Sequence, residues 1–221
     1  MTTLGKKLST MFAAGPLLAF SAFGISAPAH AHHPMGGALP GNFMDGLLSG
    51  IGHPVIGIDH LAFIIAVGIA SAFLTARYLL PLYFVGGTVL GCLLYSVGGV
   101  ALPYTEFFIA ASVLVLGALV MSGRELNSTL CAALFSVAGL FHGSAYAGEI
   151  LGVEAAPLVA YLIGFSLVQY AIAAAAGFLT RETWKASNAL AMQPRLAGAL
   201  LAGVGLTFLI ERIESMAFPG V

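Results

Sequence analysis

The chain of 221 residues is 59% hydrophobic and only 8% charged, with a formal net charge of −1. A soluble domain of this size cannot bury so much apolar surface, and soluble proteins usually carry about a quarter of charged residues. The small net charge gives no basis for nucleic-acid binding. Successive runs of about twenty apolar residues instead predict an all-α polytopic membrane protein in a lipid bilayer.

The first 31 residues have the pattern of a signal peptide. Lys6 and Lys7 form a basic start, residues 8–25 are an apolar stretch, and Ala29-His30-Ala31 fits the small-x-small cleavage pattern. An uncleaved first helix is the alternative. Cleavage would leave residues 32–221 as a single transmembrane domain.

The mature chain would begin with His32 and His33. A free α-amino group beside two imidazoles can bind a divalent transition metal, whereas a short flexible His pair is often inert. The sequence leaves both interpretations open.

Six spanning helices are predicted, preceded by a shorter one. The short helix covers about residues 42–51, with Asn42 as its cap, and is too short to span a bilayer. An interfacial or re-entrant position is therefore expected for it. The spanning helices are expected at residues 53–75, 79–101, 104–122, 128–147, 155–179 and 195–215.

The distribution of Lys and Arg predicts the orientation, because cytoplasmic loops carry the excess of these residues. If the mature N-terminus is outside, only Arg212 lies near the outer face. The cytoplasmic side then carries Arg77, Arg124, Arg181, Lys185 and Arg195. The signal peptide independently predicts an outside N-terminus.

The segment from His53 to His60, His-Pro-Val-Ile-Gly-Ile-Asp-His, opens the first predicted spanning helix. His53 and His60 would share a face of a continuous helix, with Asp59 about 100° away. Pro54 and Gly57 disfavour a regular helix, and a kinked entry would let the three side chains converge. Because such groups are costly in hydrocarbon, they indicate a functional site.

A second motif, from His142 to Glu149, closes the fourth predicted spanning helix. These two residues are seven positions apart and would share a face, with Tyr146 one turn from His142. Small residues between them favour close approach of another helix. We expect that partner to be the first spanning helix, which would make one site of both motifs. A structural, hydrogen-bonded His142 is the alternative.

Imidazoles with one or two carboxylates suit Ni²⁺, Co²⁺, Cu²⁺ or Zn²⁺, whereas Mg²⁺ and Ca²⁺ prefer oxygen ligands. The absence of a Cys or Met cluster near the histidines argues against Cu(I). Cys92 and Cys131 lie in separate apolar runs and are expected to pack in the core. No prosthetic group is expected, and the chain has no nucleotide-binding motif of an ATPase subunit.

Other polar residues keep more than one interpretation. Glu106 could be a ligand, a charge of the outer vestibule or an interfacial residue. Gln169 could line a pathway or form a helix–helix hydrogen bond. The role of Tyr146 is also open.

Together the two motifs resemble the HupE/UreJ family. The resemblance rests on His-Pro-x-x-Gly-x-Asp-His, an apolar run with Val67-Gly68, and Phe-His-Gly…Gly-x after three more crossings, and covers essentially the whole mature chain. The family comprises small bacterial membrane proteins, often encoded near hydrogenase or urease genes and regarded as nickel, in some cases cobalt, permeases. The resemblance implies metal ligation by His53, Asp59 and His60, with His142 and Glu149 as the second motif's counterparts. Family members often have further histidines where this chain has Ser144 and Tyr146, so the metal stays open.

The resulting hypothesis is a secondary transporter that imports Ni²⁺ or Co²⁺ across the bacterial cytoplasmic membrane. Zn²⁺ is a less expected substrate, and no enzymatic activity is expected. Two charges gain about 4–5 kcal/mol per 100 mV of membrane potential. One alternative is an intramembrane hydrolase, with Zn²⁺ on His53, His60 and His142 and with Asp59 or Glu149 as the base. Another is a metal-binding accessory protein without transport. The coupling ion and any oligomer are left open.

Overall fold

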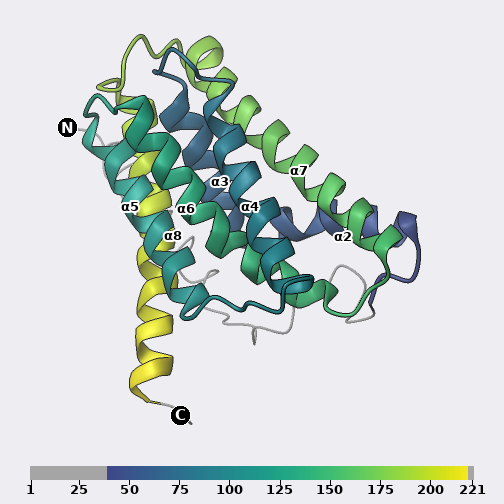
Figure 1. The fold of residues 1–221 in the computed structure, drawn as a ribbon. Coiled ribbons are helices and arrows are strands. Elements are labelled where there is room, and N and C mark those ends of the chain that lie inside the picture. The colour runs from purple at the N-terminus through teal and green to yellow at the C-terminus, as the bar shows by residue number, and fades with distance from the viewer. Residues whose placement is uncertain (1–38, 219–221) are drawn as a thin grey trace, which may run out of the picture. The chain divides into compact units, whose positions relative to one another are not determined.

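The computed structural model describes residues 39–218, all of which belong to one compact unit. The predicted signal peptide and the His32–His33 pair lie outside the described residues. Within them every regular element is a helix, joined to the next by turns and loops, and there is no strand (Figure 1). The helices are α2 (Phe43–Ile56), α3 (Ile58–Ser71), α4 (Leu80–Ser96), α5 (Thr105–Ser122), α6 (Ser128–Ala147), the 3₁₀ turn η2 (Gly148–Ile150), α7 (Ala155–Phe178), the π turn η3 (Leu179–Thr183) and α8 (Met192–Ala217).

Four helical stretches in residues 39–218 are long and apolar enough to cross a membrane. They are α5, α6 with η2, α7 with η3, and α8; the bent pair α2–α3 adds a fifth if it forms one span. Helix α4 is apolar but has only 17 residues. The chain is therefore an all-helical protein with four or five candidate spans. The prediction of six spans after a cleaved signal peptide is not confirmed by the described residues.

The first predicted spanning helix, 53–75, is broken in the structure. Helices α2 and α3 meet at Gly57 with a bend of 80°, and Gly57 has an extended backbone, with φ −71° and ψ 104°. His53 therefore belongs to the preceding helix α2, which is longer than predicted, starts at the expected Asn42 cap and contains Pro54. The anticipated interruption before Asp59 is confirmed, and it takes the form of a sharp corner.

The second predicted spanning helix also ends early, at Ser96 instead of residue 101. Gly98 and Gly99 follow, and Gly99 has a positive φ of 68°. A left-handed glycine is a common terminator of helices, so this difference has a local cause.

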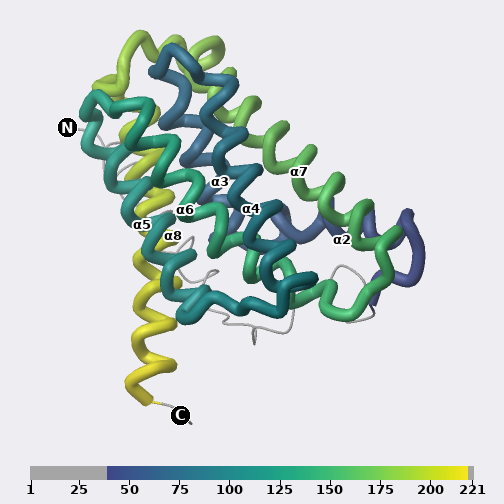
Figure 2. The backbone as a smooth tube through the Cα atoms, in the orientation of Figure 1, coloured from purple at the N-terminus to yellow at the C-terminus, as the bar shows by residue number. Residues whose placement is uncertain are grey.

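Helix α6 packs along α4, not along α3 as the sequence analysis expected (Figure 2). A Cβ on Gly143 would overlap the carbonyl group of Thr88, and one on Gly139 would overlap the backbone of Phe84 and Gly87. Gly143 of the second motif and the preceding Gly139 thus allow close approach of α4. Helix α3 meets α6 through the side chains of His60 and Phe63, which contact His142.

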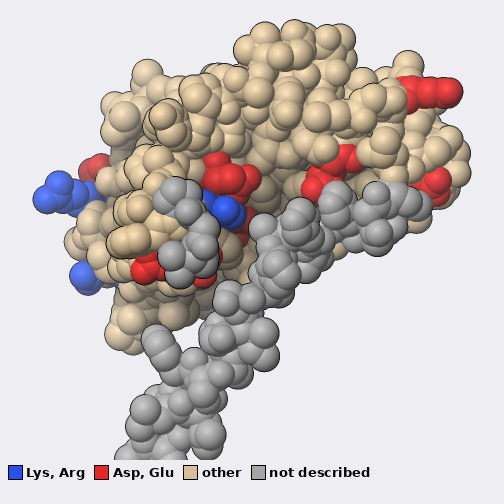
Figure 3. Space-filling model, turned by 90° about the horizontal axis from the view of Figure 1, so that it is seen from below, with Lys and Arg blue, Asp and Glu red and all other residues tan. Residues whose placement is uncertain are grey.

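Charged side chains are sparse on the surface. Figure 3 shows Asp and Glu at several separate places on the face seen from below, where α8 ends and α4 connects to α5.

Candidate functional site

Three imidazoles meet inside the helix bundle. His53 comes from α2, His60 from α3 and His142 from α6, and their side chains are 7%, 6% and 0% exposed. The ring centroids of His60 and His142 are 4.8 Å apart, and those of His53 and His60 are 5.8 Å apart. The corner at Gly57 turns α2 so that His53 approaches His60 from a separate helix.

Tyr146 of α6 lies against two of these rings. Its ring centroid is 4.6 Å from that of His53 and 4.6 Å from that of His60, and its side chain is fully buried. The Tyr161 hydroxyl donates to the Tyr146 carbonyl over 3.1 Å. Tyr146 therefore belongs to the wall of the histidine cluster, and Tyr161 supports it from α7.

A chain of hydrogen bonds connects the cluster to α5. His60 Nδ1 lies 2.7 Å from His142 Nδ1, and His142 Nε2 lies 3.1 Å from Ser112 Oγ. The Ser112 hydroxyl donates to the Ile109 carbonyl over 2.7 Å. Sequence reasoning missed Ser112, because a serine in an apolar run carries no motif and its bond to the preceding turn is ordinary.

Asp59 is partly buried in the first turn of α3, where its carboxylate accepts the backbone N–H of His60 over 2.8 Å. A carboxylate at this position also compensates the helix dipole. Beyond this backbone contact, the convergence of Asp59 with the imidazoles stays a prediction.

Glu149 lies in η2, beyond the last residue of α6, and is partly buried. The helical face that it was expected to share with His142 ends at Ala147. Its role as a counterpart ligand stays a prediction.

Across residues 39–218, no three His, Cys, Asp or Glu side chains are arranged to hold one metal ion together. The 2.7 Å between His60 Nδ1 and His142 Nδ1 leaves no room for an ion between these nitrogens, since each metal–nitrogen bond needs about 2 Å. An ion would have to bind on another side of His60, with rearranged neighbours. The predicted ligand set stays a prediction.

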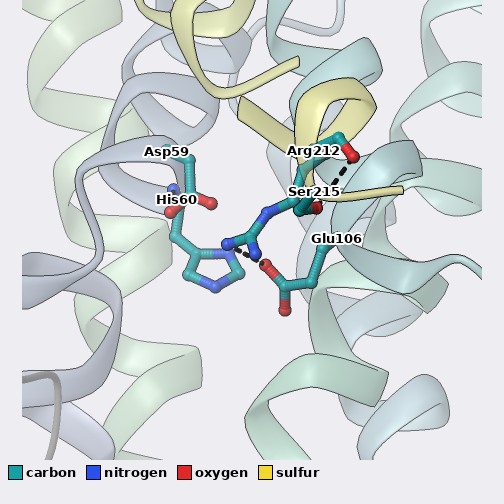
Figure 4. Close-up of polar contacts among 5 residues, drawn as sticks. All are labelled: Asp59, His60, Glu106, Arg212 and Ser215. Carbon is teal, nitrogen blue, oxygen red and sulfur yellow. Dashed lines mark hydrogen bonds and ion pairs between the residues drawn. The ribbon is translucent and has the colours of Figure 1, made fainter. Parts of the chain in front are cut away.

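Glu106 and Arg212 form an ion pair of 3.2 Å between α5 and α8. Figure 4 draws this pair with Asp59 and His60. The Glu106 and Arg212 side chains are 48% and 32% exposed, so the pair lies at the surface. The interpretations of Glu106 as a ligand, a charge of the outer vestibule or an interfacial residue all stay predictions.

Gln169 of α7 accepts the Thr88 hydroxyl of α4 over 3.0 Å, and both side chains are fully buried. The Gln169 side chain also lies next to the Tyr146 hydroxyl. Of the two interpretations of Gln169, the helix–helix hydrogen bond is the one seen.

A separate cavity of about 470 Å³ lies at the opposite end of α3, where it is lined by Ile69, Ala70 and Val120 and by the polar side chains of Arg124, Arg181 and Asn188. The histidine cluster is not part of it.

The sequence matches the HupE / UreJ protein family over residues 18–208. It is also 30% identical over 197 residues to the protein HupE of Rhizobium leguminosarum bv. viciae, a match that covers 82% of this chain and 93% of that protein. No solved structure matches the chain.

Proposed function

Because this chain belongs to the HupE / UreJ family, we propose that it is a secondary transporter that imports Ni²⁺ or Co²⁺ across the bacterial cytoplasmic membrane. The observation that carries the proposal is the meeting of His53, His60 and His142 from three helices in a buried cluster. Imidazole suits these borderline ions, and polar groups at such depth are costly unless they serve a function.

The ion would enter at the end where Asp59, Glu106 and Arg212 lie. Acidic groups there raise the local concentration of cations. After cleavage of the signal peptide, His32 and His33 at the new N-terminus would be the first residues to bind the ion. His60 and His53 would then replace water ligands of the ion, and Asp59 would compensate part of its charge after turning away from the α3 backbone.

Release would occur toward the cavity at the opposite end of α3. The buried residues Val67, Val113 and Leu116 belong to the apolar cluster that extends from Phe63, which contacts His142, to Ile69 and Val120 at the cavity. This apolar layer closes the route, so transport needs a movement of α3 relative to α5 and α6. A membrane potential of 100 mV supplies about 4–5 kcal/mol for two charges.

The purified full-length protein in liposomes tests this proposal. Ni²⁺, Co²⁺ and Zn²⁺ are offered separately under an inside-negative potential, and entry is followed with a trapped indicator. We expect saturable entry of Ni²⁺ or Co²⁺ that His60→Ala abolishes. Metal binding without entry would favour the accessory alternative, and Zn²⁺-dependent turnover of lipid or peptide would favour the hydrolase.

A further inference from the structure

We propose that Ser112 fixes the proton positions of His142 and His60, so that His60 offers Nε2 as the metal-binding nitrogen and His142 acts as a positioning residue. This inference rests on the proposed function for the metal, but the proton arrangement concerns the chain alone. It also assigns a role to Ser112, which no motif indicated.

The arrangement starts at Ser112, whose hydroxyl has a single proton. That proton is used in the 2.7 Å bond to the Ile109 carbonyl, which cannot itself donate. With the proton in this shorter bond, Ser112 Oγ accepts at its longer, 3.1 Å contact with His142 Nε2. It follows that the proton of this contact belongs to His142 Nε2.

His142 is fully buried, and its ring lies against those of Phe63 and Phe84, at centroid distances of 4.8 and 5.3 Å. A charged imidazolium at such a place would be costly without a carboxylate partner. The polar contacts of His142 seen among the residues that the structure describes are those with His60 and Ser112. A neutral ring with its proton on Nε2 has a bare Nδ1, which can only accept a hydrogen bond.

The 2.7 Å contact between the two Nδ1 atoms then needs a proton from His60. Neutral His60 accordingly carries its proton on Nδ1 and keeps the lone pair on Nε2. This is the common arrangement of metal-binding histidines, in which one nitrogen binds the ion and the other donates to a fixed acceptor. His142 is that acceptor, so it orients His60 and does not itself bind the ion.

Nitrogen NMR of the ¹⁵N-histidine-labelled, full-length protein without metal tests the arrangement directly, since protonated and unprotonated ring nitrogens have well-separated shifts. His60→Gln and His142→Gln spectra assign the two rings. We expect His142 protonated at Nε2 and His60 at Nδ1. The opposite tautomers, or rings that interconvert freely, would overturn the proposal.

Ser112→Ala removes the acceptor, so the ordered tautomers should be lost and Ni²⁺ affinity should fall by about 10- to 100-fold, the usual cost of an outer partner. Ser112→Thr should restore both. Ser122→Ala is the matched control, because Ser122 makes the same 2.7 Å bond to the preceding turn of α5. Tautomers unchanged in Ser112→Ala would contradict the proposal.

The variant His142→Gln tests whether His142 is a positioning residue or a ligand. A Gln amide can also accept a hydrogen bond from His60 and donate one to Ser112. We expect this variant to bind Ni²⁺ more tightly than His142→Ala; equal loss in both would make His142 a ligand and overturn the proposal. If the expected tautomers are seen but wild-type liposomes take up no metal, the transport proposal fails and the proton arrangement stands.

Discussion

His60 Nδ1 and His142 Nδ1 lie 2.7 Å apart and join α3 to α6 through a polar contact between residues 82 positions apart. The contact is buried and shares its surroundings with Tyr146, His53 and Ser112. It brings together the two histidine motifs of the chain, although the helices that carry them pack mainly against other partners.

His60→Ala is expected to lower Ni²⁺ affinity by more than His53→Ala does. Both rings contact Tyr146, and His60 is in addition held by His142 through the 2.7 Å contact of their Nδ1 atoms. Both are proposed ligands, but loss of His60 also removes the contact with His142 that orients the ligand, so its effect should be the larger one. Equilibrium dialysis of purified protein measures both variants, and a stronger effect of His53→Ala would show that His53 is the principal ligand.

Gly57→Ala should weaken metal binding through His60. The Gly57 backbone angles suit alanine, but the added Cβ would lie 2.6 Å from His60 Cδ2, so the ring must move. Gly86→Ala on α4 is the control, because a Cβ there has no neighbour within 4 Å. The same dialysis assay checks the pair, and wild-type affinity in Gly57→Ala would mean that the corner does not control the ring.

Glu106→Gln should raise the KM for Ni²⁺ uptake, and Arg212→Gln should lower it. Each substitution changes the net charge at this end of the helices by one unit. After screening by salt, this change should alter the KM about two- to threefold. Protein stability should change little, since exposed ion pairs contribute about 0–1 kcal/mol. Both KM effects should shrink at high ionic strength, and effects on maximal rate alone would argue against capture at this rim.

Gly143→Ala should destabilise the protein, because the new Cβ would overlap the Thr88 carbonyl and force α4 and α6 apart. Overpacking of this kind costs about 1–3 kcal/mol. Gly148→Ala is the control, because a Cβ added at Gly148 has no neighbour within 4 Å. Thermal unfolding in detergent compares the two, and equal melting temperatures would contradict the observed packing of α6 on α4.

Local sequence signals predicted part of this structure. Apolar runs gave the helices, and Pro54 with Gly57 indicated the interruption before Asp59. Residue spacing cannot give the angle at Gly57, because this angle depends on how α2 packs along α7. The early end of α4 was signalled by Gly98 and Gly99, but glycine is also frequent inside membrane helices.

The pairing of helices was the harder part. The small residues after His142 indicated a close neighbour but not which one, and α4 supplies it through Thr88 and Phe84. Ser112 could not be found, because its importance depends on a long-range contact with His142. The Glu106–Arg212 pair likewise joins α5 and α8, which are far apart in the sequence.

The most direct test of transport at the histidine cluster is metal accumulation in cells that lack their own nickel and cobalt importers. Cells expressing the wild type, His60→Ala or Gly86→Ala at equal membrane abundance are offered trace Ni²⁺ or Co²⁺. We predict that the wild type and Gly86→Ala accumulate one of the two metals and that His60→Ala does not. Accumulation by His60→Ala at the wild-type rate, or by none of the three, would contradict the account.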